Sequence, residues 1–203
     1  MFTGIVAAVG TIIDVAPLMN QADSGCKLTI DAGRLAMSDV ALGDSIAVNG
    51  ACMTVVSKHD NLFCVDISRE SLQLTSGLDK PGPVNLEKAL TLNDRIGGHL
   101  VTGHVDGVGS VVKFSPVNES MELIISSPKN LGKFLAYKGS VVVNGVSLTV
   151  NRVADYPDRC EFSINLIPHT LQVTTLNHLK PGMQVNLEID VIARYVERMM
   201  TAT

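Results

Sequence analysis

The sequence has no tryptophan, and aromatic residues make up only 4% of its 203 positions. It also has no excess of basic charge, because 16 lysine and arginine residues face 20 acidic ones and the net charge is −4 at pH 7. The basic residues do not gather in any one stretch. Proteins that bind the phosphate backbone of a nucleic acid carry a cluster of basic residues. We therefore expect no nucleic-acid partner.

Long hydrophobic runs are missing as well. No stretch approaches the roughly 20 apolar residues that span a bilayer. The apolar start MFTGIVAAVGTII lacks the positive flank of a signal peptide, because the first basic residue is Lys27 and three residues, Thr3, Gly4 and Gly10, interrupt it. We expect a cytoplasmic protein with no membrane partner.

Cysteine is scarce and widely spaced. The four cysteines are Cys26, Cys52, Cys64 and Cys160, and none forms a CxxC pair. In a chain without an export signal, this pattern favours reduced thiols over a disulfide framework, and it does not indicate a zinc or other metal site.

The sequence does contain an internal repeat. The stretch SIAVNGACMTVV at Ser45–Val56 matches SVVVNGVSLTVN at Ser140–Asn151. Three further pairs of blocks match in the same order: Phe2–Ile12 with Val101–Val111, Phe63–Thr75 with Phe162–Thr174, and Lys80–Glu87 with Lys180–Glu188. The period of about 100 residues is long enough for each copy to close its own core. The repeat predicts a duplicated domain.

Short β-branched runs, cut by turn residues, predict strands in the first copy and their counterparts in the second. The expected strands are Gly4–Val15, Lys27–Ile30, Ser45–Val48, Met53–Val56 and Leu62–Ile67. This spacing is typical of an antiparallel barrel or sandwich, and closed barrels leave no exposed edge strands. Two segments with polar caps, 32–40 and 128–137, predict short helices.

The end of the chain has no counterpart in the first copy. From Asp190 onward Gly and Pro are absent, and Ile189, Ile192, Val196 and Met199 recur at helical spacing. A helix this short needs a partner surface. Two partners fit the pattern: the helix docks on its own barrel, or it associates with helices of other subunits.

Differences between the copies indicate where two similar pockets do different work. Ile5 is replaced by His104, Cys52 by Ser147, Gly43 by Lys138, and Glu70 by His169, whereas Thr54/Thr149 and Gly4/Gly103 are retained. Retained glycines and hydroxyls suit a polar heterocycle or a polyol chain, although they are also ordinary turn and strand residues.

Two of the differing positions are candidates for catalysis. The imidazole of His104 can transfer a proton near neutral pH, and Cys52 can act as a nucleophile. A structural histidine, a small core cysteine and, for Lys138, a solvated turn lysine are the alternatives.

Several motifs together resemble one family, that of riboflavin synthase, which also includes the lumazine proteins. The motifs are MFTGIV at the start, NGACMTV at Asn49–Val55, GGHLVTGHVDG at Gly97–Gly107, NGVSLTV at Asn144–Val150 and NLIPHT at Asn165–Thr170. The resemblance implies an all-β fold of two tandem, six-stranded, Greek-key-like barrels with short helices and a C-terminal α-helix. The implied domains are two lumazine-binding barrels at 1–89 and 90–188, and an oligomerisation helix at 189–203.

The resemblance also implies a reaction, the last step of riboflavin biosynthesis. Two molecules of 6,7-dimethyl-8-ribityllumazine exchange a four-carbon unit and give riboflavin and 5-amino-6-(D-ribitylamino)uracil, without a cofactor. The implied assembly is a homotrimer whose productive site forms between barrels of neighbouring subunits, and lumazine synthase is a further partner it suggests. The alternative is a lumazine protein, which binds lumazine or flavin without converting it.

The implied site residues follow by position. His104 is the candidate for proton transfer, Cys52 or Ser45 for supplying or activating the nucleophile, and Asp190 matches an acidic family position but equally fits the N-cap of the last helix. The implied lumazine contacts of the first barrel are Gly4, Ile5, Val6, Cys52, Met53, Thr54, Asp66, Ile67, Ser68, Arg69, Glu70 and Ser71. Those of the second barrel are Gly103, His104, Val105, Lys138, Ser147, Leu148, Thr149, Asn165, Leu166, Ile167, Pro168, His169 and Thr170.

Overall fold

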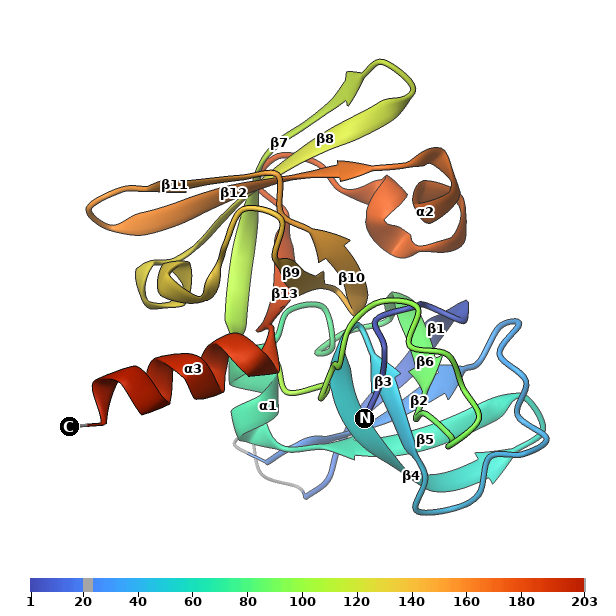
Figure 1. Cartoon of the computed structure of the whole chain (residues 1–203). Helices are drawn as coiled ribbons and strands as arrows, with labels where there is room; N and C mark the ends of the chain where they lie inside the picture. Colours follow the sequence, from blue (N-terminus) through green and yellow to red (C-terminus); the bar gives the residue numbers. More distant parts are fainter. Residues whose placement is uncertain (20–23, 203) are drawn as a thin grey trace.

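The computed structural model describes residues 1–19 and 24–202 and is built mostly of strands (Figure 1). The first half contains β1 (Ala8–Pro17), β2 (Cys26–Asp31), β3 (Ser45–Val48), β4 (Ala51–His59), β5 (Leu62–Ile67), α1 (Arg69–Leu74) and β6 (Gly82–Lys88). The second half contains β7 (Gly107–Val117), β8 (Ser120–Pro128), the 3-10 helix η1 (Lys129–Phe134), β9 (Ser140–Val143), β10 (Val146–Thr149), β11 (Arg152–Asp155), β12 (Arg159–Leu166), α2 (Pro168–Val173), the 3-10 helix η2 (Thr175–His178), β13 (Gln184–Ile189) and α3 (Val191–Thr201). Within the described ranges, no helix has the length and apolar character needed to cross a membrane.

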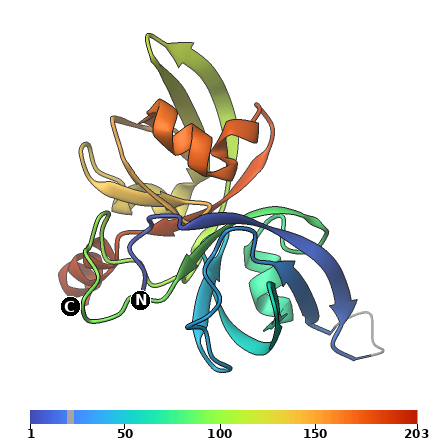
Figure 2. The same ribbon diagram turned by 90° about the vertical axis from the view of Figure 1, so that its right-hand side faces the viewer.

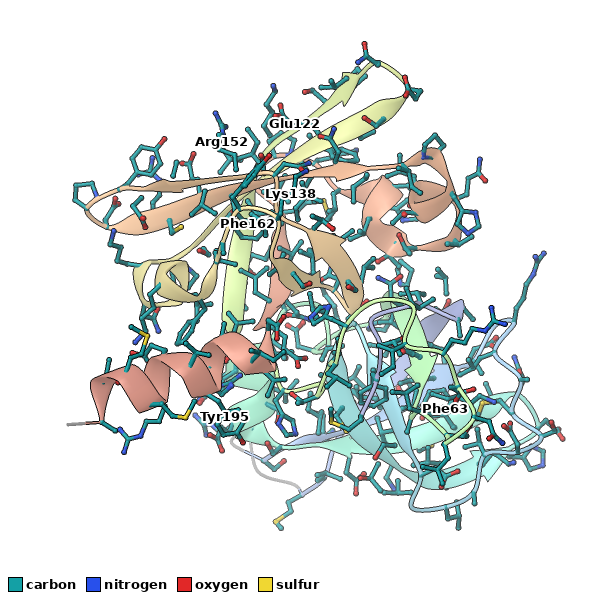
Figure 3. The ribbon with its side chains drawn as sticks, in the orientation of Figure 1. Phe63, Glu122, Lys138, Arg152, Phe162 and Tyr195 are labelled. Carbon is teal, nitrogen blue, oxygen red and sulfur yellow. The ribbon has the colours of Figure 1, made fainter. Side chains whose placement is uncertain are left out.

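The first half closes into a six-stranded antiparallel barrel in the order β1-β2-β5-β4-β3-β6. Its strands alternate between buried and exposed residues, because successive side chains of a strand point to opposite faces. Along β4, for example, Met53 and Val55 point into the core while Thr54 and Val56 are exposed. Phe63 is fully buried inside this barrel (Figure 3).

The second half repeats this architecture with one strand interrupted. Its sheet has seven strands in the order β10-β9-β13-β7-β8-β12-β11. The counterpart of β4 is divided into β10, which pairs with β9, and β11, which pairs with β12. The division falls at Val150–Asn151, where the backbone still bonds on both sides: Val150 N donates to Gly139 O and Asn151 N to Ser163 O. The sheet therefore curls around its own core, which holds Phe162 (Figure 3).

The structure confirms the predicted all-β fold and its two similar halves. Strands β3 and β5 have the predicted bounds, Ser45–Val48 and Leu62–Ile67. The segment 128–137 forms η1, but the expected helix at 32–40 was wrong. That segment makes two separate turns. In the first turn, Gly33 adopts a φ of +61° and Leu35 N donates to Ala32 O; in the second, Val40 N donates to Met37 O.

The two halves pack one above the other in Figure 2, and equivalent residues of each half make matching contacts across the junction. Asn85 Nδ2 donates to the carbonyl of Asn144 at 2.8 Å, and Asn186 Nδ2 donates to the carbonyl of Asn49 at 3.0 Å. At the centre, Gly50 and Gly145 approach so closely that a Cβ on Gly50 would lie 2.8 Å from Gly145 N. Matched polar bonds of this kind fix the relative register of the halves.

The C-terminal helix α3 leaves the molecule beside the junction of the halves (Figure 1). It docks on its own half through polar residues: Arg194 pairs with Asp106, and Glu197 pairs with Lys133 of η1. The large apolar side chains of the helix remain exposed, and they are Ile192, Tyr195, Val196, Met199 and Met200. Figure 3 shows Tyr195 on the side of α3 that faces away from the second sheet. Ile189, predicted as part of the helical stripe, instead ends β13 and is buried.

Candidate active site

A cavity of about 500 Å³ lies on the outer face of the first barrel. Its walls come from β4, from the end of β5 and α1, and from a loop of the second half, and the lining residues are Ala51, Cys52, Met53, Thr54, Val56, Asp66, Ile67, Ser68, Glu70, Ser71, Leu74, Thr75, Gly103, His104 and Val105. The volume falls in the usual range for small-molecule sites. The cavity brings the two catalytic candidates Cys52 and His104 together.

The lining combines polar groups with apolar walls. Hydroxyls of Thr54, Ser68 and Ser71 can donate and accept hydrogen bonds. The Ser68 hydroxyl already accepts from Ser71 N at 3.1 Å, which caps the start of α1 and fixes this edge of the cavity. A flat heteroaromatic ring with a polyol chain suits this combination, because the ring can pack on the apolar walls while the chain meets the hydroxyls.

The loop that carries His104 reaches the first barrel from the second half. Cys52 N donates to the carbonyl of Gly103 at 2.8 Å, and Val105 packs against the core of the first barrel. Gly103 has a φ of +77°, and a Cβ there would lie 2.6 Å from Cys52 Cβ. Only glycine fits this close approach without strain.

A buried carboxylate anchors the start of this loop. Glu188 Oε1 accepts from Thr102 N and from Thr102 Oγ1, both at 2.7 Å, and Glu188 Oε2 accepts from Gly103 N at 3.0 Å. Glu87 makes the equivalent three bonds to Thr3 and Gly4 in the first half. Burial raises the pKa of both carboxyls, and the donated hydrogen bonds oppose this rise.

The second half carries an equivalent site, whose loop comes from the first half. We call the cavity on the first barrel and this second site the two cradles. Ser147 N donates to the carbonyl of Gly4 at 2.8 Å, and Val6 packs against the second core. The segment 165–170 ends β12 and begins α2, just as 66–71 ends β5 and begins α1. The structure thus brings Gly4 to Ser147. The other predicted residues of this cradle correspond by position in the repeat to residues of the first cavity or of its border, and they are Ile5, Val6, Leu148, Thr149, Asn165, Leu166, Ile167, Pro168, His169 and Thr170.

The expected grouping of residues by half needs a correction. The loops 4–6 and 103–105 are exchanged, so each lies against the strand of the opposite half. The physical reason is the pair of main-chain bonds from Cys52 to Gly103 and from Ser147 to Gly4, which cross the junction symmetrically. Each cradle therefore depends on both halves of the chain.

His99, absent from the predicted site residues, lies in the second cradle. Its Nδ1 is 2.7 Å from Ser147 Oγ, and its buried Nε2 has no hydrogen-bond partner among the described residues. Burial lowers the pKa of His99, and the negative charge of Asp190 partly opposes this. The imidazole is thus held toward its neutral form beside the serine that replaces Cys52.

Ser45, Asp190 and Lys138 are among the predicted residues that lie outside the 500 Å³ cavity. Ser45 lines a separate hollow of about 830 Å³ beneath the segment 89–97, although it is paired across the strands with Thr54. Asp190 Oδ1 accepts from Ile192 N at 2.9 Å and so caps α3. Lys138 lies on the second half (Figure 3), where its φ is +63° and its Nζ donates to Asn151 Oδ1 at 3.0 Å.

Sequence reasoning missed the anchoring residues Glu87 and Glu188. The signal was present, because the matched blocks KPGPVNLE and KPGMQVNLE both end on these glutamates. Their role could not be read from the repeat, since the partners lie more than 80 residues away. No group of three or more His, Cys, Asp or Glu side chains suited to a metal ion occurs in the described part of the chain.

Comparison with known proteins identifies the family of this chain. The family model for the lumazine binding domain matches twice, at residues 3–89 and 102–190. The chain therefore belongs to the lumazine-binding domain family. Riboflavin synthase of Mycobacterium tuberculosis (strain ATCC 25618 / H37Rv) is 43% identical over 204 residues, covering 98% of this chain and 98% of that protein.

Other relatives and solved structures are similar to this chain over nearly its whole length. Riboflavin synthase of Photobacterium phosphoreum is 42% identical over 202 residues, covering 98% of this chain and 89% of the relative. Riboflavin synthase of Bacillus subtilis (strain 168) is 39% identical over 202 residues, covering 98% and 90%. The crystal structure of LumP with 6,7-dimethyl-8-(1'-D-ribityl) lumazine superposes with a TM-score of 0.78 at 27% identity, covering 93% of this chain and 98% of LumP. LumP with riboflavin gives a TM-score of 0.80 at 28% identity, covering 93% and 99%.

Proposed function

We propose that the protein is a riboflavin synthase. It transfers a four-carbon unit from one molecule of 6,7-dimethyl-8-ribityllumazine to a second, giving riboflavin and 5-amino-6-(D-ribitylamino)uracil. One observation carries the proposal: the chain is about 40% identical, over nearly its whole length, to riboflavin synthases of several bacteria. The two products together contain all the atoms of the two reactants, so the reaction balances without an oxidant or reductant.

The cavity on the first barrel holds one lumazine in this proposal. Its hydroxyls bind the ribityl chain and its apolar walls pack against the ring. The second cradle, on a neighbouring subunit, presents the second lumazine face to face with the first. Holding two reactants in this way is a proximity effect that contributes on the order of 7 to 11 kcal/mol.

Cys52 and His104 carry the chemistry that the protein supplies. The ring methyl of one lumazine must lose a proton, and a nucleophile must add to the ring of the other. His104 is assigned the proton transfer and Cys52 the delivery or activation of the nucleophile, since both line the same cavity. Ser45 and Asp190 stay secondary candidates, because Ser45 faces another hollow and the Asp190 carboxylate is engaged in capping α3.

The working assembly is a homotrimer joined through α3. The exposed apolar stripe of this helix supports association with copies of itself, because its polar side already faces its own half. In this proposal residues 1–89 and 90–188 are the two lumazine-binding domains, and 189–203 join the subunits. Association with lumazine synthase is a further partner to test by co-sedimentation.

The function is tested by incubating the purified chain with 6,7-dimethyl-8-ribityllumazine in chelator-treated buffer without cofactor. We expect riboflavin to form, with two lumazines consumed for each riboflavin produced. Lumazine that binds but remains unconverted would instead indicate a lumazine protein. A titration that finds a single lumazine site per chain would contradict the use of both cradles.

A further inference from the structure

The loop that carries His104 has a second anchor, separate from Glu188. We call residues 102–106 the His104 loop. It forms no helix or strand of its own, so its position depends on the bonds at its two ends. Glu188 fixes the start of the loop, as described above. The end of the loop is fixed by Asp106.

Asp106 connects the loop to both β13 and the C-terminal helix. Its main-chain N donates to the carbonyl of Leu187 at 2.8 Å, and its Oδ2 accepts from Ile189 N at 2.9 Å. Its Oδ1 accepts from Arg194 Nη2 at 2.8 Å. The Asp106 side chain is only 11% exposed, whereas that of Arg194 is 44% exposed. One carboxylate thus joins the loop to the first turn of α3 and to the strand before it.

The first half has no such connection. Ala7 occupies the position equivalent to Asp106, and it keeps only the main-chain bond, from Ala7 N to the carbonyl of Leu86 at 2.9 Å. Beyond β6 the chain continues into the segment 89–97 instead of a helix. Folding requirements shared by the halves therefore do not account for the Asp106–Arg194 ion pair. The pair is added only to the loop that carries His104, the residue that most distinguishes the two cradles.

We propose that Asp106 and Arg194 are positioning residues, through which α3 holds His104 in its working place opposite Cys52. The inference rests on the proposed function, because the working place is defined by the reaction of lumazine in the first cavity. Neither residue lines that cavity. Both act through the loop, and seating of α3 in the assembled protein stabilises the loop at the same time.

The ion pair can be broken from either side in the full-length protein. Arg194→Met removes the cation and keeps a long side chain with good helix propensity. Asp106→Asn removes the charge and retains an oxygen that can accept from Ile189 N. Lys133→Met is the matched control, because it breaks the other ion pair between α3 and its own half without touching the loop. Arg194→Lys keeps the charge and tests for rescue.

Three quantities are measured on each variant: the turnover of 6,7-dimethyl-8-ribityllumazine, its dissociation constant, and the hydrogen exchange of the peptide spanning 101–107. We expect Arg194→Met and Asp106→Asn to lower kcat roughly tenfold to a hundredfold with less than a threefold change in the dissociation constant. Exchange of the loop amides should rise at least tenfold in both variants. Lys133→Met should match the wild type, and Arg194→Lys should recover most of the kcat.

The outcomes separate this inference from the proposed function. An inactive wild-type chain would overturn the proposed function, whatever the exchange data show. An active wild type with full kcat in either Arg194→Met or Asp106→Asn would overturn the positioning role, as would an equal loss in Lys133→Met. Sedimentation of each variant shows whether α3 still assembles. If Arg194→Met dissociates, Asp106→Asn decides, because it leaves the helix unchanged.

Discussion

The main-chain amide of Cys52 donates to the carbonyl of Gly103 at 2.8 Å, across a separation of 51 positions in the sequence. This bond joins the strand of one half to the loop of the other, and the bond from Ser147 to Gly4 repeats it. The cavity that holds Cys52 and His104 therefore exists only when the two halves are packed together. The site is therefore complete only in the packed arrangement of the two halves.

Gly103 should be far less tolerant of a side chain than a glycine with the same backbone conformation in open space. Gly103→Ala adds a methyl group 2.6 Å from Cys52 Cβ, whereas at Gly77, whose φ of +76° is nearly the same, a Cβ meets no atom within 4 Å. Gly77→Ala should cost only the strain of its φ, about 1 to 2 kcal/mol. Gly103→Ala should cost about 1 to 3 kcal/mol more, because the halves must shift.

Urea denaturation of the two alanine variants measures this difference in stability, and titration with lumazine measures the affinity of the cavity. Gly103→Ala should also weaken lumazine binding, whereas Gly77→Ala should leave it intact. Equal stabilities for the two variants would mean that the close approach of Gly103 to Cys52 relaxes at no cost.

Glu188 should make stability fall as the pH rises above the ordinary carboxyl range. Burial raises its pKa above the usual 4.5, so the folded state binds more protons than the unfolded state between 4.5 and the raised value. The stabilising contribution is therefore complete below pH 4.5 and is lost as the pH rises through the raised pKa. The slope cannot exceed about 1.4 kcal/mol per pH unit for each carboxyl.

Glu188→Gln removes this titration. Urea denaturation of wild type and variant between pH 4 and pH 8 should show the wild type losing stability relative to the variant as the pH rises. Glu87→Gln should behave in the same way, because Glu87 accepts the equivalent hydrogen bonds and burial shifts its pKa in the same direction. A wild type that gains relative stability with rising pH would show that the hydrogen bonds outweigh burial.

His104→Ala should separate catalysis from binding. If His104 transfers a proton, its loss should lower kcat roughly a hundredfold or more, while the lumazine dissociation constant changes little. His59→Ala is a suitable control, because His59 is an exposed histidine at the end of β4 and lies outside the cavity. Equal losses of kcat and affinity would make His104 a binding residue instead.

The exposed stripe of α3 should control assembly. Ile192→Glu combined with Met199→Glu places two charges on side chains that are 64% and 71% exposed in the single chain. Charges buried between apolar helices are costly, so sedimentation should show monomers. Arg198→Glu, which changes the net charge by the same amount outside the stripe, should leave the proposed trimer intact. A trimer that survives the double substitution would show that the subunits associate without α3.

The fold was largely predictable because its signal is local and repeated. Short β-branched runs cut by turn residues predicted strands such as Leu62–Ile67, and most of these strands overlap blocks that recur in the second copy. The helices α1 and α2 were not predicted, since six residues are too few to show a helical period. The break in the strand at Val150–Asn151 also left no pattern that distinguishes it from its unbroken counterpart.

The exchange of loops could not be predicted from the repeat. Two equivalent segments match equally well whether each packs on its own half or on the other. Only the three-dimensional contacts of Gly4 and Gly103 distinguish the two arrangements. The sequence predicted the residues Cys52 and His104 but not the geometry that joins them.

Gly50 and Gly145 pack backbone against backbone at the centre of the junction, where a side chain on either residue would push the halves apart. Each cradle takes one wall from each half, so a side chain at this single point should displace the walls of both proposed sites together. A methyl group here would lie away from both cradles, yet we expect it to weaken binding of the lumazine that donates the four-carbon unit and of the one that accepts it. The geometry of both proposed sites thus depends on one contact between two glycines.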